Sequence, residues 1–140
     1  MSEFVDTNVL LYAAANDAVR KQQLSLGLIA RLWNERKGVL STQVLSEFYH
    51  NATRKLRLSA ESAEEAVKDY SRWKLHRPDH ASVLGAIRLE QRYRVAWYEA
   101  MILNSALETE CSILWTEDFQ DGQRFGDLTV RNPYKSVRSV

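Results

Sequence analysis

The sequence predicts an α/β fold with three layers, α/β/α, around a central, mainly parallel sheet of about five strands. Short apolar runs typical of strands alternate along the chain with longer segments in which apolar residues recur every three or four positions, as in helices. This alternation favours parallel strands joined by crossover helices that cover both faces of the sheet. The chain of 140 residues has 45% hydrophobic residues and no linker-like tract, which indicates one domain, 1–140.

The first half of the chain predicts two strands, 3–5 and 39–41, each followed by helical patterns. Helices are expected over about 7–15, over 20–37, from 42 to about 56, and from 59 or 62 onward. Gly38 is expected to end the second helix, and Thr42 to cap the third. Ser62 with Glu65 has the spacing of a capping box, although Ser59 is an alternative start for the fourth helix.

The second half predicts a short edge strand at 73–76, before the break at Arg77-Pro78-Asp79. Helices are expected over 80–93 and 97–108, because apolar residues recur there at helical spacing. Strands are expected at 112–116 and 128–131, on either side of a polar loop at 117–126.

Four acidic residues lie where this fold ends a strand or begins a helix: Asp6, Glu47, Glu99 and Asp118. Residues just past the carboxyl ends of parallel strands meet in one crevice, even when they are far apart in sequence. Carboxylates crowded together raise one another's pKa unless cations neutralise them. The sequence therefore predicts a Mg²⁺ or Mn²⁺ site at this edge of the sheet.

Each acid also has a structural interpretation. Asp6 would cap the helix that follows it, and Asp118 would be a turn residue. Glu47 lies opposite the apolar stripe of its helix, where a solvent-facing residue is expected, and Glu99 would be favoured in a first helical turn by the helix dipole. The same face as Glu99 carries apolar residues that should be buried, so an unpaired carboxylate there would be costly. The metal interpretation depends on all four residues together.

Other features of the sequence exclude several classes of site. Cys111 is the single cysteine, so neither a disulfide nor a zinc site built on Cys pairs is expected, and a reducing, cytoplasmic location is predicted. The three histidines lack zinc-site spacing, and the chain contains no Gly-rich phosphate loop. No apolar stretch approaches the roughly 20 residues that a membrane-spanning helix needs, so no membrane association is expected.

The net charge of +1 does not indicate a partner, but basic residues are concentrated at 54–57, 72–77 and 88–94. This local excess would suit a polyanionic partner. Solvated helix faces are the alternative explanation.

Four segments together resemble the PIN-domain family, particularly the VapC-type toxins of bacterial toxin–antitoxin pairs. They are FVDTNVLLYA at the start, STQVLSEFYH at 41–50, AWYEAMILNSAL at 96–107 and CSILWTEDFQDGQ at 111–123. The resemblance implies a PIN-like fold and a metal-dependent endoribonuclease that hydrolyses RNA phosphodiester bonds. It also implies a cognate antitoxin protein and a homodimer as partners.

The resemblance also assigns residues. It implies that Asp6, Glu47, Glu99 and Asp118 are the catalytic ligands of Mg²⁺ or Mn²⁺, with Asn8 and Thr116 as supporting polar residues. The residues expected to contact the RNA backbone are Arg54, Arg57, Arg88 and Arg92. The chain departs from the family at Glu99, where the family usually has Asp, and Mg²⁺ demands near-ideal octahedral geometry.

Two alternatives remain open from the sequence. In the first alternative, Glu99 in place of the usual Asp prevents catalysis, and the chain is a PIN-like module that binds RNA or a protein partner. A carboxylate-based phosphatase or phospho-receiver would also place an Asp at the end of the first strand. Those proteins need a second acid close to Asp6, where this chain has Asn8.

Overall fold

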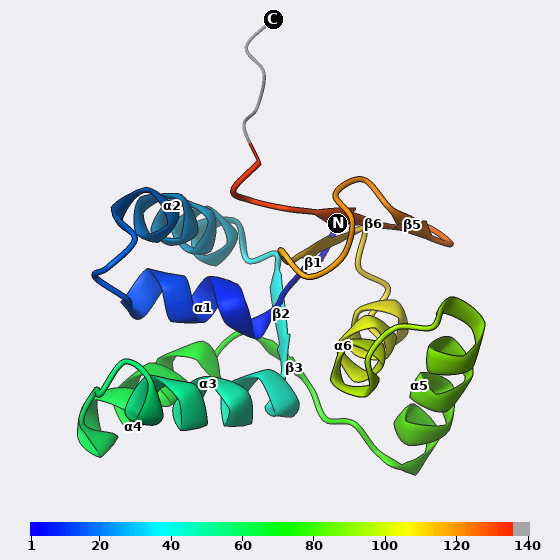
Figure 1. The fold of residues 1–140 in the computed structure, drawn as a ribbon, viewed down its shortest axis with the longest axis horizontal. Coiled ribbons are helices and arrows are strands. Elements are labelled where there is room, and N and C mark those ends of the chain that lie inside the picture. The colour runs from blue at the N-terminus through cyan, green and yellow to red at the C-terminus, as the bar shows by residue number, and fades with distance from the viewer. Residues whose placement is uncertain (136–140) are drawn as a thin grey trace, which may run out of the picture.

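A computed structural model describes residues 1–135, and residues 136–140 of the predicted domain lie outside the described residues. Helices cover both sides of a central six-stranded sheet (Figure 1). The α/β class and the mainly parallel sheet are confirmed, with six strands instead of about five.

The sheet has the strand order β3-β2-β1-β4-β6-β5. The strands are β1 (Glu3–Val5), β2 (Gly38–Ser41), β3 (Lys74–His76), β4 (Ile113–Trp115), β5 (Arg124–Phe125) and β6 (Leu128–Arg131). Every neighbouring pair is parallel except β5 with β6. The carboxyl ends of the five parallel strands therefore share one edge, and β1 lies in the interior of the sheet.

Six helices surround the sheet: α1 (Thr7–Ala14), α2 (Val19–Glu35), α3 (Thr42–Arg54), α4 (Ala60–Tyr70), α5 (His80–Tyr93) and α6 (Trp97–Glu108). In Figure 1, α1 to α4 lie on one side of the sheet, and α5 and α6 lie on the other. This arrangement follows from the topology, because β1, β2 and β3 progress toward one edge and the connection to β4 must cross back. No helix within residues 1–135 combines the length and the apolar character needed to span a bilayer.

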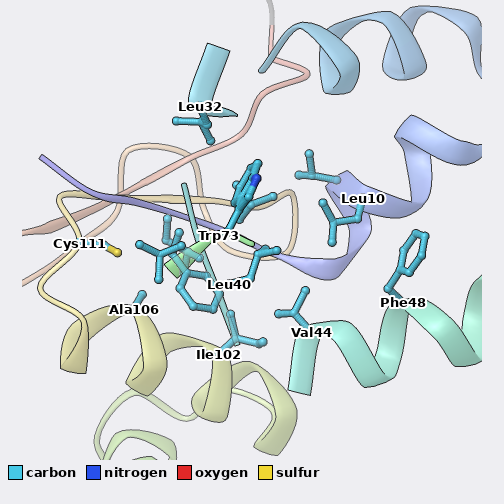
Figure 2. Close-up of a cluster of buried hydrophobic side chains, with 14 of the residues drawn as sticks. Leu10, Leu32, Leu40, Val44, Phe48, Trp73, Ile102, Ala106 and Cys111 are labelled. Carbon is cyan, nitrogen blue, oxygen red and sulfur yellow. The ribbon is translucent and has the colours of Figure 1, made fainter. Parts of the chain in front are cut away.

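The hydrophobic core holds the starts of α1, α3 and α6 against the sheet. Leu10, Val44 and Ile102 reach toward Leu40 of β2 from these three helices (Figure 2). Leu10, Val44 and Leu40 are fully buried. Burying a side chain of this size stabilises the fold by about 1.5–3 kcal/mol. The core thus fixes the three helix starts that carry or adjoin three of the predicted acids.

Two predicted helix boundaries were wrong. The helix α2 ends because Arg36 adopts a left-handed conformation with φ of 55° and donates its N–H to the carbonyl of Leu32. Gly38 is instead the first residue of β2. The cap of α3 is Ser41, whose hydroxyl accepts the Val44 N–H at 3.2 Å, and Thr42 is the first helical residue.

Of the two starts predicted for α4, Ser59 is the cap, since its hydroxyl accepts the Ser62 N–H at 3.0 Å. One further detail differs from the prediction. The predicted loop at 117–126 contains the short strand β5, which pairs antiparallel with β6. A two-residue strand is too short to produce a recognisable alternation of apolar and polar residues.

Gly38 is required by a close approach of Trp73. A Cβ atom at position 38 would lie 2.3 Å from two carbons of the Trp73 ring, which is 8% exposed and packs against Trp33 and Tyr70. We therefore expect Gly38→Ala to destabilise the protein by about 1–3 kcal/mol in urea unfolding, because the rigid indole cannot move aside.

Gly27→Ala is the matched control, because a Cβ there meets nothing within 4 Å and Gly27 lies inside α2. It should stabilise the protein by about 0.5–1 kcal/mol. A Gly38→Ala variant as stable as the Gly27→Ala variant would contradict the packing described for Trp73.

Candidate active site

Asp6 lies at the carboxyl end of β1 and is 5% exposed. Its backbone N–H donates to the carbonyl of Trp115, so β1 and β4 remain paired up to this residue. One carboxylate oxygen accepts the Thr7 N–H at 2.6 Å and caps α1, and the other accepts the Thr116 hydroxyl at 2.8 Å. The predicted capping role is therefore real, and Asp6 still lies at the edge where the strands end.

Asn8 and Thr116 link Asp6 to Asp118. The Asn8 side-chain amide donates to Asp118 Oδ2 at 3.2 Å and to Thr116 Oγ1 at 3.4 Å. The backbone N–H of Asp118 also donates to Thr116 Oγ1, at 3.1 Å. The two contacts of Asn8 join residues more than 100 positions apart in the sequence, because β1 and β4 are neighbours in the sheet.

Glu47 lies on α3, one helical turn after its first residues, and is half-buried. Its oxygens accept the Thr7 hydroxyl at 2.8 Å and the Gln43 amide at 3.1 Å. The solvent-facing orientation expected from helical periodicity is therefore wrong. Sequence reasoning missed Thr7 and Gln43, although Gln43 precedes Glu47 by four residues, a spacing that places two side chains together on a helix.

Glu99 lies in the first turn of α6 and is half-buried. As predicted, its helix face is buried, with Ile102 3% exposed and both Leu103 and Ala106 fully buried. Burial and the nearby Asp118 carboxylate raise the pKa of Glu99, and the backbone N–H of Ala96 opposes this rise. Among the four acids, Glu99 thus interacts electrostatically with Asp118.

The acids of the site raise one another's pKa values, because no positively charged side chain in the part of the chain that the structure describes neutralises them. Burial, followed by the charges of Asp118 and Glu47, raises the pKa of Asp6 from its ordinary value of 3.8 to about 7. Burial and the charges of Glu117 and Glu47 likewise raise the pKa of Asp118. Within residues 1–135, none of the four acids forms an ion pair, and the nearby Lys21 binds Glu117 at 3.0 Å.

Glu3, at the opposite end of β1, shows what a cation does to a buried acid. It is 6% exposed, almost as buried as Asp6. Burial alone would raise its pKa, but hydrogen bonds from Arg31 and Trp115, both at 2.8 Å, outweigh burial and lower the pKa. The carboxyl group of Asp6 thus differs from that of Glu3 in two ways, since it lies deeper in the protein and has no positive partner among residues 1–135, and both differences raise its pKa.

The chemistry of the donor groups suits a hard divalent cation, which prefers carboxylate and amide oxygens. In residues 1–135, three buried side-chain polar atoms have no hydrogen-bond partner, and two of them are Asn8 Oδ1 and Gln43 Oε1. Both residues bind site carboxylates through their amide nitrogens. No three Asp, Glu, His or Cys side chains in the described part form a ready metal-binding group, so the acids would have to turn toward a shared ion.

The predicted RNA-contacting arginines do not form one group. Arg54 and Arg57 lie at and just beyond the end of α3, whereas Arg88 and Arg92 lie on α5. All four side chains are exposed. The sheet lies between α3 and α5 (Figure 1), so the two pairs belong to opposite layers of the molecule.

The family model for the PIN domain matches residues 4–122. The chain belongs to the PIN-domain family. A search of curated proteins finds no match to this sequence.

Solved structures with the same fold include toxin–antitoxin proteins. A toxin–antitoxin complex from Klebsiella pneumoniae aligns with a TM-score of 0.70 and 20% identity, covering 95% of this PIN domain and 98% of that chain. VapC20 from Mycobacterium tuberculosis, a toxin that cleaves the sarcin–ricin loop, aligns with a TM-score of 0.65 and 17% identity. The alignment covers 81% of this chain and 87% of VapC20. VapBC2 from Rickettsia felis, bound to promoter DNA, aligns with a TM-score of 0.68 and 15% identity. The alignment covers 94% of this chain and 98% of that chain. At these identities the likeness establishes the fold of the PIN domain.

The pKa of Asp6 predicts how stability depends on pH. Because this pKa is raised in the folded protein, the folded state binds more protons than the unfolded chain between pH 3.8 and about 7, and stability should fall as the pH rises through that window. Asp6→Asn removes the charge, so we expect it to raise the free energy of unfolding at pH 8 by about 1–2 kcal/mol, with a flatter pH profile.

Glu3→Gln is the matched control, since the pKa of Glu3 is lowered and its charge stabilises the fold above that pKa. It should lower stability at pH 8 by about 1–3 kcal/mol. Urea unfolding from pH 4 to 8 measures both variants. Destabilisation of the Asp6→Asn variant at pH 8 would show that the Asp6 charge is compensated.

Proposed function

We propose that this PIN domain is a metal-dependent endoribonuclease that hydrolyses RNA phosphodiester bonds, acting as the toxin of a toxin–antitoxin pair. The observation that carries the proposal is the buried Asp6 carboxylate, which has two acidic neighbours and no cation. A site of this kind is unfavourable for folding and suited to holding a divalent ion. Membership of the PIN-domain family and the toxin–antitoxin structural neighbours support the same function.

In this proposal the ligands of Mg²⁺ or Mn²⁺ are Asp6, Glu47, Glu99 and Asp118. The bound ion would supply Lewis-acid polarisation of the scissile phosphate and would lower the pKa of a coordinated water. The chain's own contribution is to hold three of these acids at one edge of the sheet, from which their carboxylates would turn toward the ion. Thr116 fixes one oxygen of Asp6, Asn8 fixes Asp118, and the Thr7 hydroxyl and Gln43 amide fix Glu47.

We also propose a domain organisation, an oligomeric state and a protein partner for this chain. Residues 1–140 would act as one domain and a homodimer, and a cognate antitoxin would control the site, as the complex from Klebsiella pneumoniae suggests. The arginines of α3 and those of α5 would contact RNA from opposite layers. Long or structured RNA is therefore a more suitable substrate than a dinucleotide.

Asp6→Asn should reduce Mg²⁺- or Mn²⁺-dependent cleavage of a structured RNA by at least about 100-fold, because several kcal/mol of charge stabilisation is lost with the ligand. Gel analysis of an end-labelled RNA with a single-stranded loop measures the rate. The exposed Asp127→Asn variant is the control and should cleave like the wild type.

Titration calorimetry with Mn²⁺ tests the ligands apart from activity. Binding should weaken in the Asp118→Ala variant and persist in the Asp127→Asn variant. Unchanged cleavage by Asp6→Asn, or equal Mn²⁺ binding by the wild type and Asp118→Ala, would refute the proposed site.

One observation favours a second candidate function, an RNA- or partner-binding module with little activity. Glu99 stands where the family usually has Asp, and among the described residues no side chain donates a hydrogen bond to its carboxylate, unlike those of Asp6, Glu47 and Asp118. Its carboxylate is therefore the least constrained of the four.

We expect Glu99→Asp to raise the Mg²⁺-dependent cleavage rate by about fivefold or more, equivalent to about 1 kcal/mol in the barrier. The control is Glu61→Asp, which shortens an exposed first-turn glutamate of α4 and should change nothing. RNA binding without cleavage by both the wild type and the Glu99→Asp variant would favour the binding module.

A further inference from the structure

A pocket of about 440 Å³ lies where the starts of α3 and α6 meet the turn before α5. Its lining is mainly apolar, with hydroxyl and amide groups beside the apolar side chains. The lining residues are Thr42, Gln43, Ser46, Pro78, Trp97, Tyr98 and Met101. Apart from Gln43, whose amide holds Glu47, no residue of this lining has a role in the metal site described above.

The pocket shares a wall with the acidic cluster. The Gln43 amide nitrogen donates to Glu47 Oε2 at 3.1 Å and to the backbone carbonyl of Tyr98 at 3.4 Å. Glu99 directly follows Tyr98 in the first turn of α6. A molecule in this pocket would therefore lie next to a group held by the carboxylates.

Tyr98 is the most distinctive residue of the pocket. Its side chain is 68% exposed, compared with 40% for Tyr49 and 38% for Trp33 among the exposed aromatic residues. Within residues 1–135, its ring stacks on no other aromatic ring and its hydroxyl forms no hydrogen bond. The fold gains little from this ring, which leaves a flat aromatic face at the mouth of the pocket.

We propose that this pocket binds one unpaired RNA nucleobase beside the scissile phosphate, with the base stacked on Tyr98. The inference rests on the proposed function and specifies the substrate that the site selects: RNA with an unpaired base next to the cleaved bond. An aromatic ring stacks on any base, because every base has a π-face. The hydroxyls of Thr42 and Ser46, which line the pocket, offer polar contacts to the edge of the base.

Charge also favours a base over other occupants. The neighbouring carboxylates would repel an acidic group, whereas a nucleobase is neutral. Arg77 precedes Pro78 of the pocket, is exposed, and forms no ion pair among the described residues, so it is free to contact the adjoining phosphate. Stacking on an exposed aromatic ring with a nearby arginine is the usual way in which proteins hold single-stranded nucleic acid.

The test uses a short single-stranded RNA containing 2-aminopurine, whose fluorescence is quenched when the base stacks. The full chain is titrated in EDTA, so the readout does not depend on cleavage. The wild type should bind and quench the probe. Tyr98→Ala should weaken binding by about 10-fold and abolish the quenching that occurs when the protein binds the probe. Tyr98→Phe, which keeps the ring, should bind within about twofold of the wild type.

Tyr49→Ala is the matched control, because Tyr49 is an exposed tyrosine of α3 outside the pocket lining, and it should bind like the wild type. No quenching by the wild type, or equal quenching by Tyr98→Ala, would overturn the inference. Sedimentation of the same variants tests whether a second copy of this chain occupies the pocket instead. If Tyr98→Ala changes the mass of the assembly but not RNA binding, the pocket is a self-association surface and the inference is wrong.

The two proposals fail in different ways. If Tyr98→Ala loses binding in EDTA but the wild type cleaves no RNA with Mg²⁺ or Mn²⁺, the base pocket stands and the nuclease proposal falls. If the wild type cleaves RNA and Tyr98→Ala cleaves it with the same KM, the nuclease proposal stands and the base pocket falls.

Discussion

The constraint on which the site depends is the burial of a negative charge at the end of an interior strand. β1 is covered on both faces and flanked by β2 and β4, so Asp6, the residue that follows it, is only 5% exposed to water. At the amino end of the same strand, Arg31 compensates Glu3. At the carboxyl end, Asp6 has only neutral donors and other acids around it. A fold that neutralises one end of a strand and not the other keeps the second end available for a cation.

The topology concentrates the remaining polar groups at that end. The sheet order places β4 beside β1, so Thr116 reaches Asp6 across 110 positions of sequence. The helix α3 begins at the end of β2, which brings Glu47 to the hydroxyl of Thr7. Asp6 therefore has two structural roles. Its carboxylate caps α1, and it also accepts the hydroxyl of Thr116, which in turn accepts the backbone N–H of Asp118. Capping and function are not alternatives at this residue.

The sequence was a good guide where local pattern determines structure and a poor one where tertiary contacts do. Helical periodicity placed α5 and α6 correctly, and strand ends placed the acids near one edge. The end of α2 was mispredicted because Arg36, an ordinary residue, takes the left-handed conformation, while Gly38 is needed for contact with Trp73. Thr7 was missed because its contact with Glu47 depends on how α3 docks, whereas Gln43 lies four residues before Glu47 on the same helix and could have been found from that spacing. The basic residues are concentrated in the middle of the sequence, but the crossover from β3 to β4 carries α5, with Arg88 and Arg92, to the opposite face.

Glu99 is where the structural and functional interpretations can be separated by physical argument. A glutamate retained only to stabilise the start of α6 should interact favourably with the helix dipole and with the Ala96 N–H, and both effects lower a carboxyl pKa. The pKa of Glu99 is instead raised, because burial and the charge of Asp118 outweigh the backbone contribution. Its environment therefore penalises the ionised form that helix stabilisation would require. A carboxylate kept at a net electrostatic cost, beside two others in the same condition, fits a residue whose positive partner comes from outside the chain.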